Sequence, residues 1–175
     1  HGAKEGPSIM SGGSKIAWGK IKTIFIDISA KKDNVPACSF FGNPGNGHLV
    51  KMVHNGIEYA FMQTLSEAYM ILKNLFNLRN SEQNIFFSKL SNTNIGCYLL
   101  DTTSKVISKK KKNTFYLDIV SNEIDYNGTG NWTIYTALSY QVSIPSIYAA
   151  VSTRLLSSDF QTKNETKNSS TINLK

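Results

Sequence analysis

Residues 47–59 of the chain read Gly-His-Leu-Val-Lys-Met-Val-His-Asn-Gly-Ile-Glu-Tyr. On an α-helix, positions i, i+3, i+4 and i+7 share one face. In this stretch those positions hold four polar residues, which are Lys51, His54, Asn55 and Glu58. Apolar residues fill a second face of the same helix. A face that gathers a proton donor, a proton acceptor and hydrogen-bonding groups is what a dehydrogenase or an isomerase needs, so the stretch predicts part of an enzyme.

The helical period dominates the chain from residue 47 onward. Asn46 is expected to cap a helix that runs to about residue 78. Pro145 suits the first turn of a last helix, and the polar residues after Asp159 are expected to form a loose tail. Between these, the pattern predicts helices over 82–90, 95–108 and 115–123, a flexible loop over 127–130, and a helix from about residue 131.

The first 46 residues have a different pattern, of a strand, a helix and a second strand. Strands are expected over residues 7–10 and 35–41, with a helix from 15 to about 30 that Ser14 caps. This pattern is typical of the edge of an α/β domain and is too short to be a whole one. The expected fold is therefore mainly α, with a strand-helix-strand remnant of an α/β domain over 1–46 and part of an all-helical domain over 47–175.

The composition indicates the class of protein and its compartment. Of the 175 residues 41% are hydrophobic, enough for a sizeable core, and no apolar run approaches the ~20 residues that cross a bilayer. The two cysteines are too few for a disulfide framework or a zinc site, which favours a reducing compartment. The start has neither a secretory layout nor a methionine. We expect a cytoplasmic, metal-free protein without a membrane anchor, whose chain begins mid-protein or was trimmed and whose Asn-x-Ser/Thr triplets occur by chance.

The formal charge of +7 suits an anionic partner, such as a phosphorylated metabolite, a nucleotide or a nucleic acid. The sharpest basic run is the four lysines at 109–112. Because like charges repel and prefer water, the run indicates a solvated loop or a frayed helix end. No aromatic residue lies inside the run, so no stacking surface and no nucleic-acid partner are expected. Binding of a nucleic acid or another anion through this run stays open as an alternative.

Four segments resemble one known family. Residues 51–59, with Met62-Gln63 and Glu67-Ala68-Tyr69 after them, resemble the start of the helical domain of 6-phosphogluconate dehydrogenases. Residues 2–13, 128–133 and 154–158 resemble further segments of that family in the same order. The resemblance implies the middle of a longer, homodimeric enzyme, in which 1–46 end an NADP-binding Rossmann domain and 47–175 begin the helical domain. Ser11-Gly12-Gly13 lacks the spacing of a dinucleotide loop, so no cofactor-binding residue is expected in this chain.

Enzymes of this family oxidise 6-phosphogluconate at C3 with NADP and then release carbon dioxide, without a metal, to give ribulose 5-phosphate. The resemblance implies that Lys51 is the general base for the C3 hydroxyl and that Glu58 protonates the resulting enediol at C1. The base role requires that desolvation in a closed pocket lowers the pKa of the lysine. Helical rise would separate the two residues by about 10 Å, which suits action on different carbons of one substrate.

The resemblance also implies a set of substrate-binding residues. His54 and Asn55 match positions that bind sugar hydroxyls, and Tyr59 and Arg154 match positions that hold the phosphate. Asn131 stands where the family has a phosphate-binding lysine, so phosphate affinity is expected to be lower. Ala60-Phe61 also replaces the family's Gly-Asp.

Two readings of the catalytic residues remain. By spacing alone, Lys51, His54 and Glu58 would be ordinary surface residues of a helix, and only the family resemblance makes them functional as a set. The alternative to an enzyme is a degenerate, non-catalytic helical fragment or interaction module that kept the helix and lost the site. Because no cofactor loop is expected in it, the isolated chain is expected to show no turnover.

Overall fold

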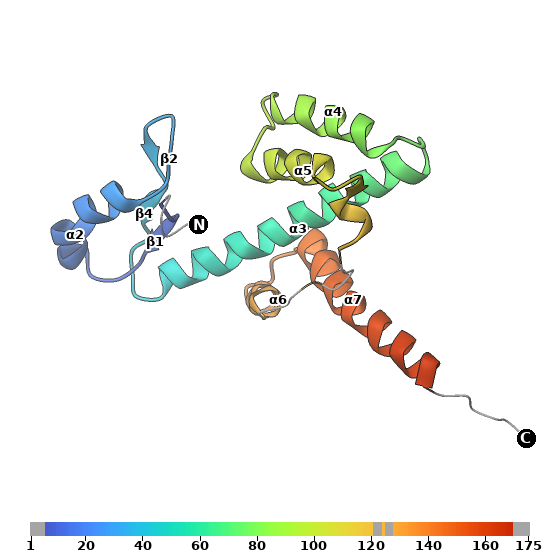
Figure 1. Cartoon of the computed structure of the whole chain (residues 1–175). Helices are drawn as coiled ribbons and strands as arrows, with labels where there is room; N and C mark the ends of the chain where they lie inside the picture. The colour runs from blue at the N-terminus through green and yellow to red at the C-terminus, as the bar shows by residue number, and fades with distance from the viewer. Residues whose placement is uncertain (1–5, 121–123, 125–127, 170–175) are drawn as a thin grey trace, which may run out of the picture. The chain divides into compact units, whose positions relative to one another are not determined.

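A computed structural model of the chain describes residues 6–120, 124 and 128–169, with side chains up to residue 157. The chain forms two compact units, residues 1–57 and 58–175, and the division falls inside one long helix. Figure 1 shows the helices and strands of both units. The expected domain boundary between residues 46 and 47 stays a prediction.

The N-terminal unit contains the expected strand, helix and strand. Its elements are β1 (Ile9–Ser11), α2 (Lys15–Ile28), β2 (Lys31–Lys32), β3 (Val35–Pro36), β4 (Cys38–Phe40) and the start of α3 (Asn46–Asn74). Strands β1 and β4 pair in parallel, with Ile9 opposite Cys38. Ser14 caps α2 as expected, because its hydroxyl accepts a hydrogen bond from the N–H of Ala17 at 3.4 Å.

The second expected strand, over residues 35–41, is divided in the structure. Its first part, β3, pairs antiparallel with β2 and its second part, β4, pairs with β1. Asp33 and Asn34 form the turn between β2 and β3 with φ values of 52° and 64°. Such left-handed turns match the twist of a two-stranded hairpin and favour Asn and Asp. Asp33 and Asn34 therefore allow a hairpin that the apolar pattern did not indicate.

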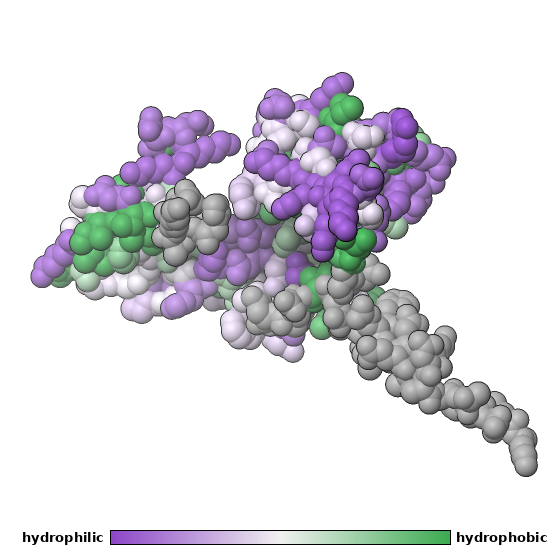
Figure 2. Space-filling model, viewed as in Figure 1, coloured by the Kyte–Doolittle hydropathy of each residue, from purple (hydrophilic) through white to green (hydrophobic). Residues whose placement is uncertain are grey.

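Helix α2 packs on the parallel strands through aromatic rings. The Trp18 ring stacks on Phe40, with 5.6 Å between centroids and 14° between planes. Other apolar side chains of α2 face solvent, among them Ile16, which is 77% exposed, and Ile24, which is 59% exposed. Figure 2 shows the resulting apolar surface in green over α2.

Two glycines allow the end of β1 to approach the first turn of α3. A Cβ on Gly12 would lie 2.7 Å from the backbone nitrogen of Gly47, and a Cβ on Gly47 would overlap the carbonyl oxygen of Met10. Asn46 is the first residue of α3, where a capping role was expected. Its side-chain amide donates to the carbonyl of Phe41 at 2.8 Å, so the amide holds the preceding loop.

The C-terminal unit is built from the rest of α3 and shorter helices. Its elements are α4 (Asn80–Ser91), α5 (Tyr98–Ser108), β5 (Lys110–Lys111), β6 (Thr114–Phe115), the 3-10 helix Tyr116–Asp118, α6 (Thr129–Ser139) and α7 (Pro145–Ser169). Helices α4 and α5 lie side by side (Figure 1). The core of the unit is a cluster of four buried side chains, which are Leu65, Phe87, Leu100 and Ile107.

Two helix expectations need correction. Helix α3 ends at Asn74 and not near 78, because Asn77 adopts a left-handed φ of 53° and the N–H of Leu78 turns back to the carbonyl of Leu72 at 2.9 Å. The expected helix over 115–123 is wrong for its described part, residues 115–120, and 121–123 lie outside the described residues. There the chain forms β6 and a single 3-10 turn, because Tyr116 donates its N–H to Lys109 at 2.9 Å and closes a hairpin.

The ends of the last two helices also differ from expectation. Gly128, expected in a flexible loop, precedes α6 in the left-handed conformation, so the helix begins at Thr129. Pro145 is the first residue of α7, as expected. The expected loose tail after Asp159 is wrong up to Ser169, because α7 continues to that residue. No glycine or proline follows Pro145 in the helix, so nothing in the sequence ends it earlier.

Candidate active site

The first part of the predicted site lies in the N-terminal unit. Helix α3 is continuous from Asn46 to Asn74, so Lys51, His54 and Asn55 fall on one face of one helix. His54 and Asn55 are half-buried, with 3.4 Å between the Nδ1 atom of His54 and the Oδ1 atom of Asn55. A hydrogen bond there requires the tautomer with a proton on Nδ1 and leaves Nε2 as an acceptor. The pair can therefore offer both donors and acceptors to a polyhydroxylated ligand.

Lys51 lines a pocket of about 670 Å³ within the same unit. The pocket lies where β1, α2 and the first turns of α3 meet, at the carboxyl end of the parallel strand β1, which is where open α/β sheets bind ligands. Trp18, Phe25 and Phe40 supply an apolar wall, and Ser14 and His48 add polar groups. Lys51 itself is exposed, so the closed, dry surroundings that the base role requires are not formed by this unit alone.

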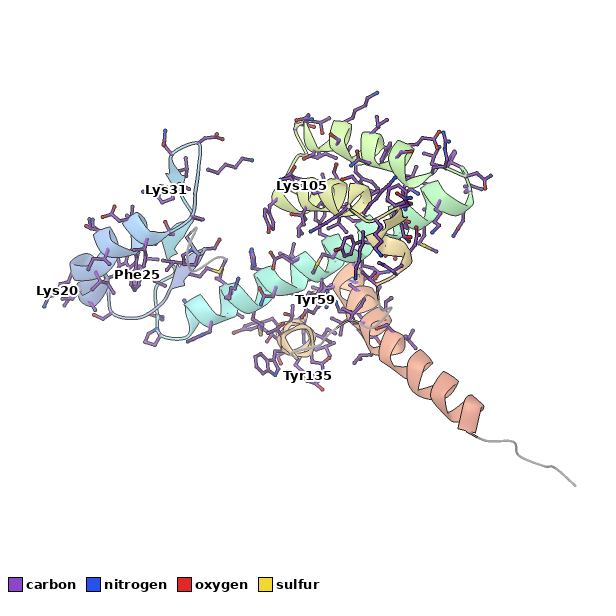
Figure 3. The ribbon with its side chains drawn as sticks, viewed as in Figure 1. Lys20, Phe25, Lys31, Tyr59, Lys105 and Tyr135 are labelled. Atoms are coloured by element: carbon purple, nitrogen blue, oxygen red, sulfur yellow. The ribbon has the colours of Figure 1, made fainter. Side chains whose placement is uncertain are left out.

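The second part of the predicted site lies in the C-terminal unit, where Tyr59 and Arg154 are in contact. The guanidinium carbon of Arg154 on α7 lies 3.9 Å from the centroid of the Tyr59 ring on α3. The hydroxyl of Tyr59 lies 3.4 Å from the hydroxyl oxygen of Thr129 at the start of α6. Figure 3 shows Tyr59 at the point where α3, α6 and α7 come together. Packing therefore joins two predicted phosphate-binding residues that are far apart in the sequence.

Two neighbours of this pair were not expected as site residues. Thr129 bonds Tyr59, and the Sδ atom of Met62 lies 4.0 Å from the Nη2 atom of Arg154. Met62 lies three residues after Tyr59, so both project from the same side of α3. Helical spacing was thus a usable signal for Met62. Nothing local in the sequence indicated Thr129, which meets Tyr59 only through packing of α6 on α3.

Two other predicted residues lie nearby in the same unit. Glu58 is a half-buried residue of α3. Asn131 lies in the first turn of α6 and lines a pocket of about 230 Å³ with Tyr135, Tyr148 and Val151. An asparagine there can donate hydrogen bonds but brings no charge, unlike the lysine of the family pattern.

The lysine run is exposed to solvent, as expected, but Lys110 and Lys111 form a strand of a β-hairpin and not a loop or a frayed helix end. Residues 109–112 are exposed, and β5 pairs with β6. The Nζ atom of Lys110 lies 4.4 Å from the centroid of Phe115, its cross-strand partner, and the Nζ atom of Lys109 lies 5.4 Å from that of Tyr116. Figure 2 shows polar side chains in purple over the part of this unit that holds α5 and the hairpin.

The described part of the chain contains neither a cluster of metal-ligand side chains nor a helix that could span a membrane. There, no three histidine, cysteine, aspartate or glutamate side chains come together as metal ligands would. None of the described helices combines the length and apolarity that a membrane span needs. Cys38 and Cys97 are free thiols, and burial raises the pKa of Cys38, which disfavours its thiolate.

Comparison with known proteins was made by sequence and by structure. Residues 47–174 match the family model described as 6-phosphogluconate dehydrogenase, C-terminal domain. The decarboxylating 6-phosphogluconate dehydrogenase of Dictyostelium discoideum is 41% identical over 163 residues, which are 90% of this chain and 33% of that protein. The NADP(+)-dependent, decarboxylating enzyme of Bacillus subtilis is 40% identical over 159 residues, which are 90% of this chain and 34% of that protein.

A solved structure is similar over nearly the whole chain. It is the 6-phosphogluconate dehydrogenase of Plasmodium falciparum, described in its apo form, with its cofactor NADP+ and with its substrate 6-phosphogluconate. The TM-score is 0.85 at 34% sequence identity, and the match covers 99% of this chain and 38% of that one. The chain spans about a third of the length of the curated relatives it matches.

Proposed function

The chain belongs to the 6-phosphogluconate dehydrogenase family, and on that premise we propose that it contributes to an enzyme that converts 6-phosphogluconate to ribulose 5-phosphate with NADP. The observation that carries the proposal is the contact between Tyr59 and Arg154, two residues that match phosphate-binding positions of the family. A guanidinium beside a phenol hydroxyl is chemistry suited to a phosphate group.

We propose a division of the chain into two domain segments. Residues 1–46 would end an NADP-binding Rossmann domain, and residues 47–175 would begin the helical domain. The parallel pairing of β1 with β4 across α2 supports the first assignment, and the start of the family match at residue 47 supports the second. The exposed isoleucines of α2 fit a surface that further strands or helices of a Rossmann domain would cover.

In the first step Lys51 would act as the general base. Its neutral amine would take the proton of the C3 hydroxyl as the hydride leaves C3 and a ketone forms, and bound NADP would supply the hydride acceptor. The amine must be neutral for this step, and Lys51 is exposed in this chain. The proposal therefore requires that bound ligand or further protein covers the 670 Å³ pocket and removes water from the amine.

In the second step the carboxylate leaves as carbon dioxide. Lys51, now protonated, gives its proton to the ketone oxygen, so the electron pair of the broken C–C bond forms an enediol. Glu58, in its protonated form, then gives a proton to the carbon that becomes C1 of the product, and Lys51 takes back the hydroxyl proton to leave the ketone of ribulose 5-phosphate. The two residues are seven positions apart on one continuous helix.

The remaining predicted residues would bind the substrate. His54 and Asn55 would bond sugar hydroxyls, and Tyr59, Arg154 and Asn131 would hold the phosphate end. Among the described residues no glycine-rich dinucleotide turn follows a strand, so we assign no cofactor-binding residue to this chain. A homodimer in the cytoplasm, with no nucleic acid or membrane as partner, completes the proposal.

The proposal is tested by two assays of the gene product that contains this chain. With 6-phosphogluconate and NADP it should form NADPH and release carbon dioxide in equal amounts. The 175-residue chain alone should form neither, because we assign no cofactor-binding residue to it. Substrate-dependent NADPH formation by the isolated chain would contradict the second expectation. No turnover by the gene product would favour the alternative, a degenerate helical fragment that kept the helix and lost the site.

A further inference from the structure

Gly130, in the first turn of α6, lies in a space that has no room for a side chain. A Cβ at this position would lie 2.5 Å from the Cγ2 atom of Val151 on α7, and 3.2 Å and 3.3 Å from the Cε2 and Cδ2 atoms of Tyr59 on α3. Val151 is 2% exposed, so it is packed on all sides and has little freedom to move away. A single methyl group at residue 130 would therefore displace its neighbours.

The backbone does not explain a glycine here. Gly130 is a helical residue without a positive φ, a conformation that every residue type adopts. Glycine weakens a helix relative to alanine, so local propensity disfavours it at this position. What glycine provides is close approach of α6 to the Tyr59 ring and to Val151. The position is thus explained by packing against Tyr59 and Val151.

Gly130 leaves space for the Tyr59 ring, and the same ring is in contact with Arg154. Tyr59 has its hydroxyl beside Thr129 at 3.4 Å and the Arg154 guanidinium over its face at 3.9 Å. A ring pushed away from α6 would shift both contacts, because the ring is rigid. The Nη2 atom of Arg154 also lies 4.0 Å from the Sδ atom of Met62, which is a weak acceptor.

We propose that Gly130 is a positioning residue for Arg154. By leaving space for the Tyr59 ring against α6, it sets the place and tilt at which the guanidinium meets the phosphate group of the substrate. The inference rests on the proposed function, in which Tyr59 and Arg154 hold that phosphate. Gly130 touches no substrate in this account, and its effect passes through Tyr59.

The experiment compares two ligands on the gene product that contains this chain. Dissociation constants are measured for 6-phosphogluconate and for gluconate, which lacks the phosphate, with the parent protein and Gly130→Ala. The variant should bind 6-phosphogluconate about tenfold more weakly, the size of one well-placed cation–π contact, and should bind gluconate unchanged. Gly19→Ala is the matched control, because a Cβ there meets nothing within 4 Å. Equal losses for the two ligands, or none, would overturn the inference.

Two further variants separate this inference from the proposed function. In an Arg154→Gln background, Gly130→Ala should cause a smaller further loss than in the parent, since the part of its effect that passes through Arg154 is already gone, and a fully additive loss would refute the positioning role. If Arg154→Gln alone leaves 6-phosphogluconate affinity intact, the phosphate assignment itself is wrong and the inference is wrong with it. Should Gly130→Ala fail to fold, Gly130→Ala with Val151→Ala relieves the tightest contact, and it should show a smaller loss with the same preference for the phosphorylated ligand.

Discussion

The guanidinium of Arg154 lies over the ring of Tyr59, with 3.9 Å between the guanidinium carbon and the ring centroid. Arginine carries five N–H donors, so a guanidinium in contact with an aromatic ring can still donate to an anion. An arginine supported in this way loses less conformational freedom when it binds an anion. In the proposed site, the contact would therefore favour binding of the substrate phosphate.

Replacement of Arg154 tests this role. Arg154→Gln removes the charge and the fork, so the dissociation constant for 6-phosphogluconate should rise about 10- to 100-fold, the range of a lost hydrogen bond to a charged group. Arg154→Lys keeps the charge but lacks the planar fork. Its dissociation constant should lie between those of the parent and of Arg154→Gln. Titration calorimetry of the gene product measures the dissociation constants of both variants. Arg79→Gln is the control, since that side chain is 81% exposed. An equal loss in the control variant would contradict the assignment.

A substitution at Asn131 should strengthen substrate binding. Asn131→Lys restores the residue type of the family pattern, and a charged donor should lower the Michaelis constant for 6-phosphogluconate roughly fivefold. A lysine in the first turn opposes the helix dipole, so the unfolding midpoint should fall slightly. Asn113→Lys adds the same charge at the exposed hairpin turn and should change neither quantity much. If both variants lower the Michaelis constant equally, general charge and not position 131 is responsible.

The lysine hairpin contains a strained residue. Lys112 has a φ of 56°, which costs a non-glycine side chain about 1 kcal/mol, so in Lys112→Gly the relief of strain should offset the freedom that glycine adds to the unfolded chain, and the variant should be neutral to slightly more stable. Asn113 in the same turn has no positive φ and provides the matched control. Asn113→Gly should be neutral or destabilising, because it only adds freedom to the unfolded chain. Urea denaturation of the two variants measures the difference, and equal effects would show that backbone conformation is not the cause.

The start of α4 predicts a pH dependence. The Arg79 side chain, and after it the Arg79 backbone N–H at 2.8 Å, hold the pKa of Glu82 below its usual range. A carboxylate with a lowered folded-state pKa stabilises the fold above its unfolded pKa, and this contribution is lost as the pH falls through the folded pKa. Glu82→Gln should therefore be less stable than the parent at neutral pH and equally stable in strong acid.

NMR titration of the Glu82 carboxyl measures the same effect directly. Its midpoint should lie below the usual glutamate value in the parent protein. In Arg79→Gln it should move back toward that value, because the largest cause of the lowering is removed. A midpoint at the usual value in the parent would show that the Arg79 contacts do not form in solution.

Sequence reasoning succeeded where the signal is local. The period of apolar residues predicted α3, the side chain of Ser14 predicted the start of α2, and Pro145 predicted the start of α7. It failed where pairing between two strands decides the structure. The hairpin at 110–115 depends on cross-strand pairing of Lys110 with Phe115, and no helical or strand period reveals such a pairing in so short a segment.

The candidate site shows the same division. The face of α3 that carries Lys51 and His54 follows from helical spacing, whereas Arg154 could be assigned only through the family resemblance. No local pattern reveals that Gly130 leaves space for Tyr59, because that space exists only after α6 packs on α3 and α7. Nor could the sequence show that Lys51 is exposed in this chain, since exposure depends on what covers the helix.

The proposed catalytic role of Lys51 is tested most directly by the rate of NADPH formation. The gene product that contains this chain, given 6-phosphogluconate and NADP, should lose about 10²- to 10⁴-fold in turnover with Lys51→Ala, the usual contribution of a positioned base. Lys15→Ala, at an exposed position on α2, should keep the parent rate. A Lys51→Ala variant as fast as the parent would contradict the account.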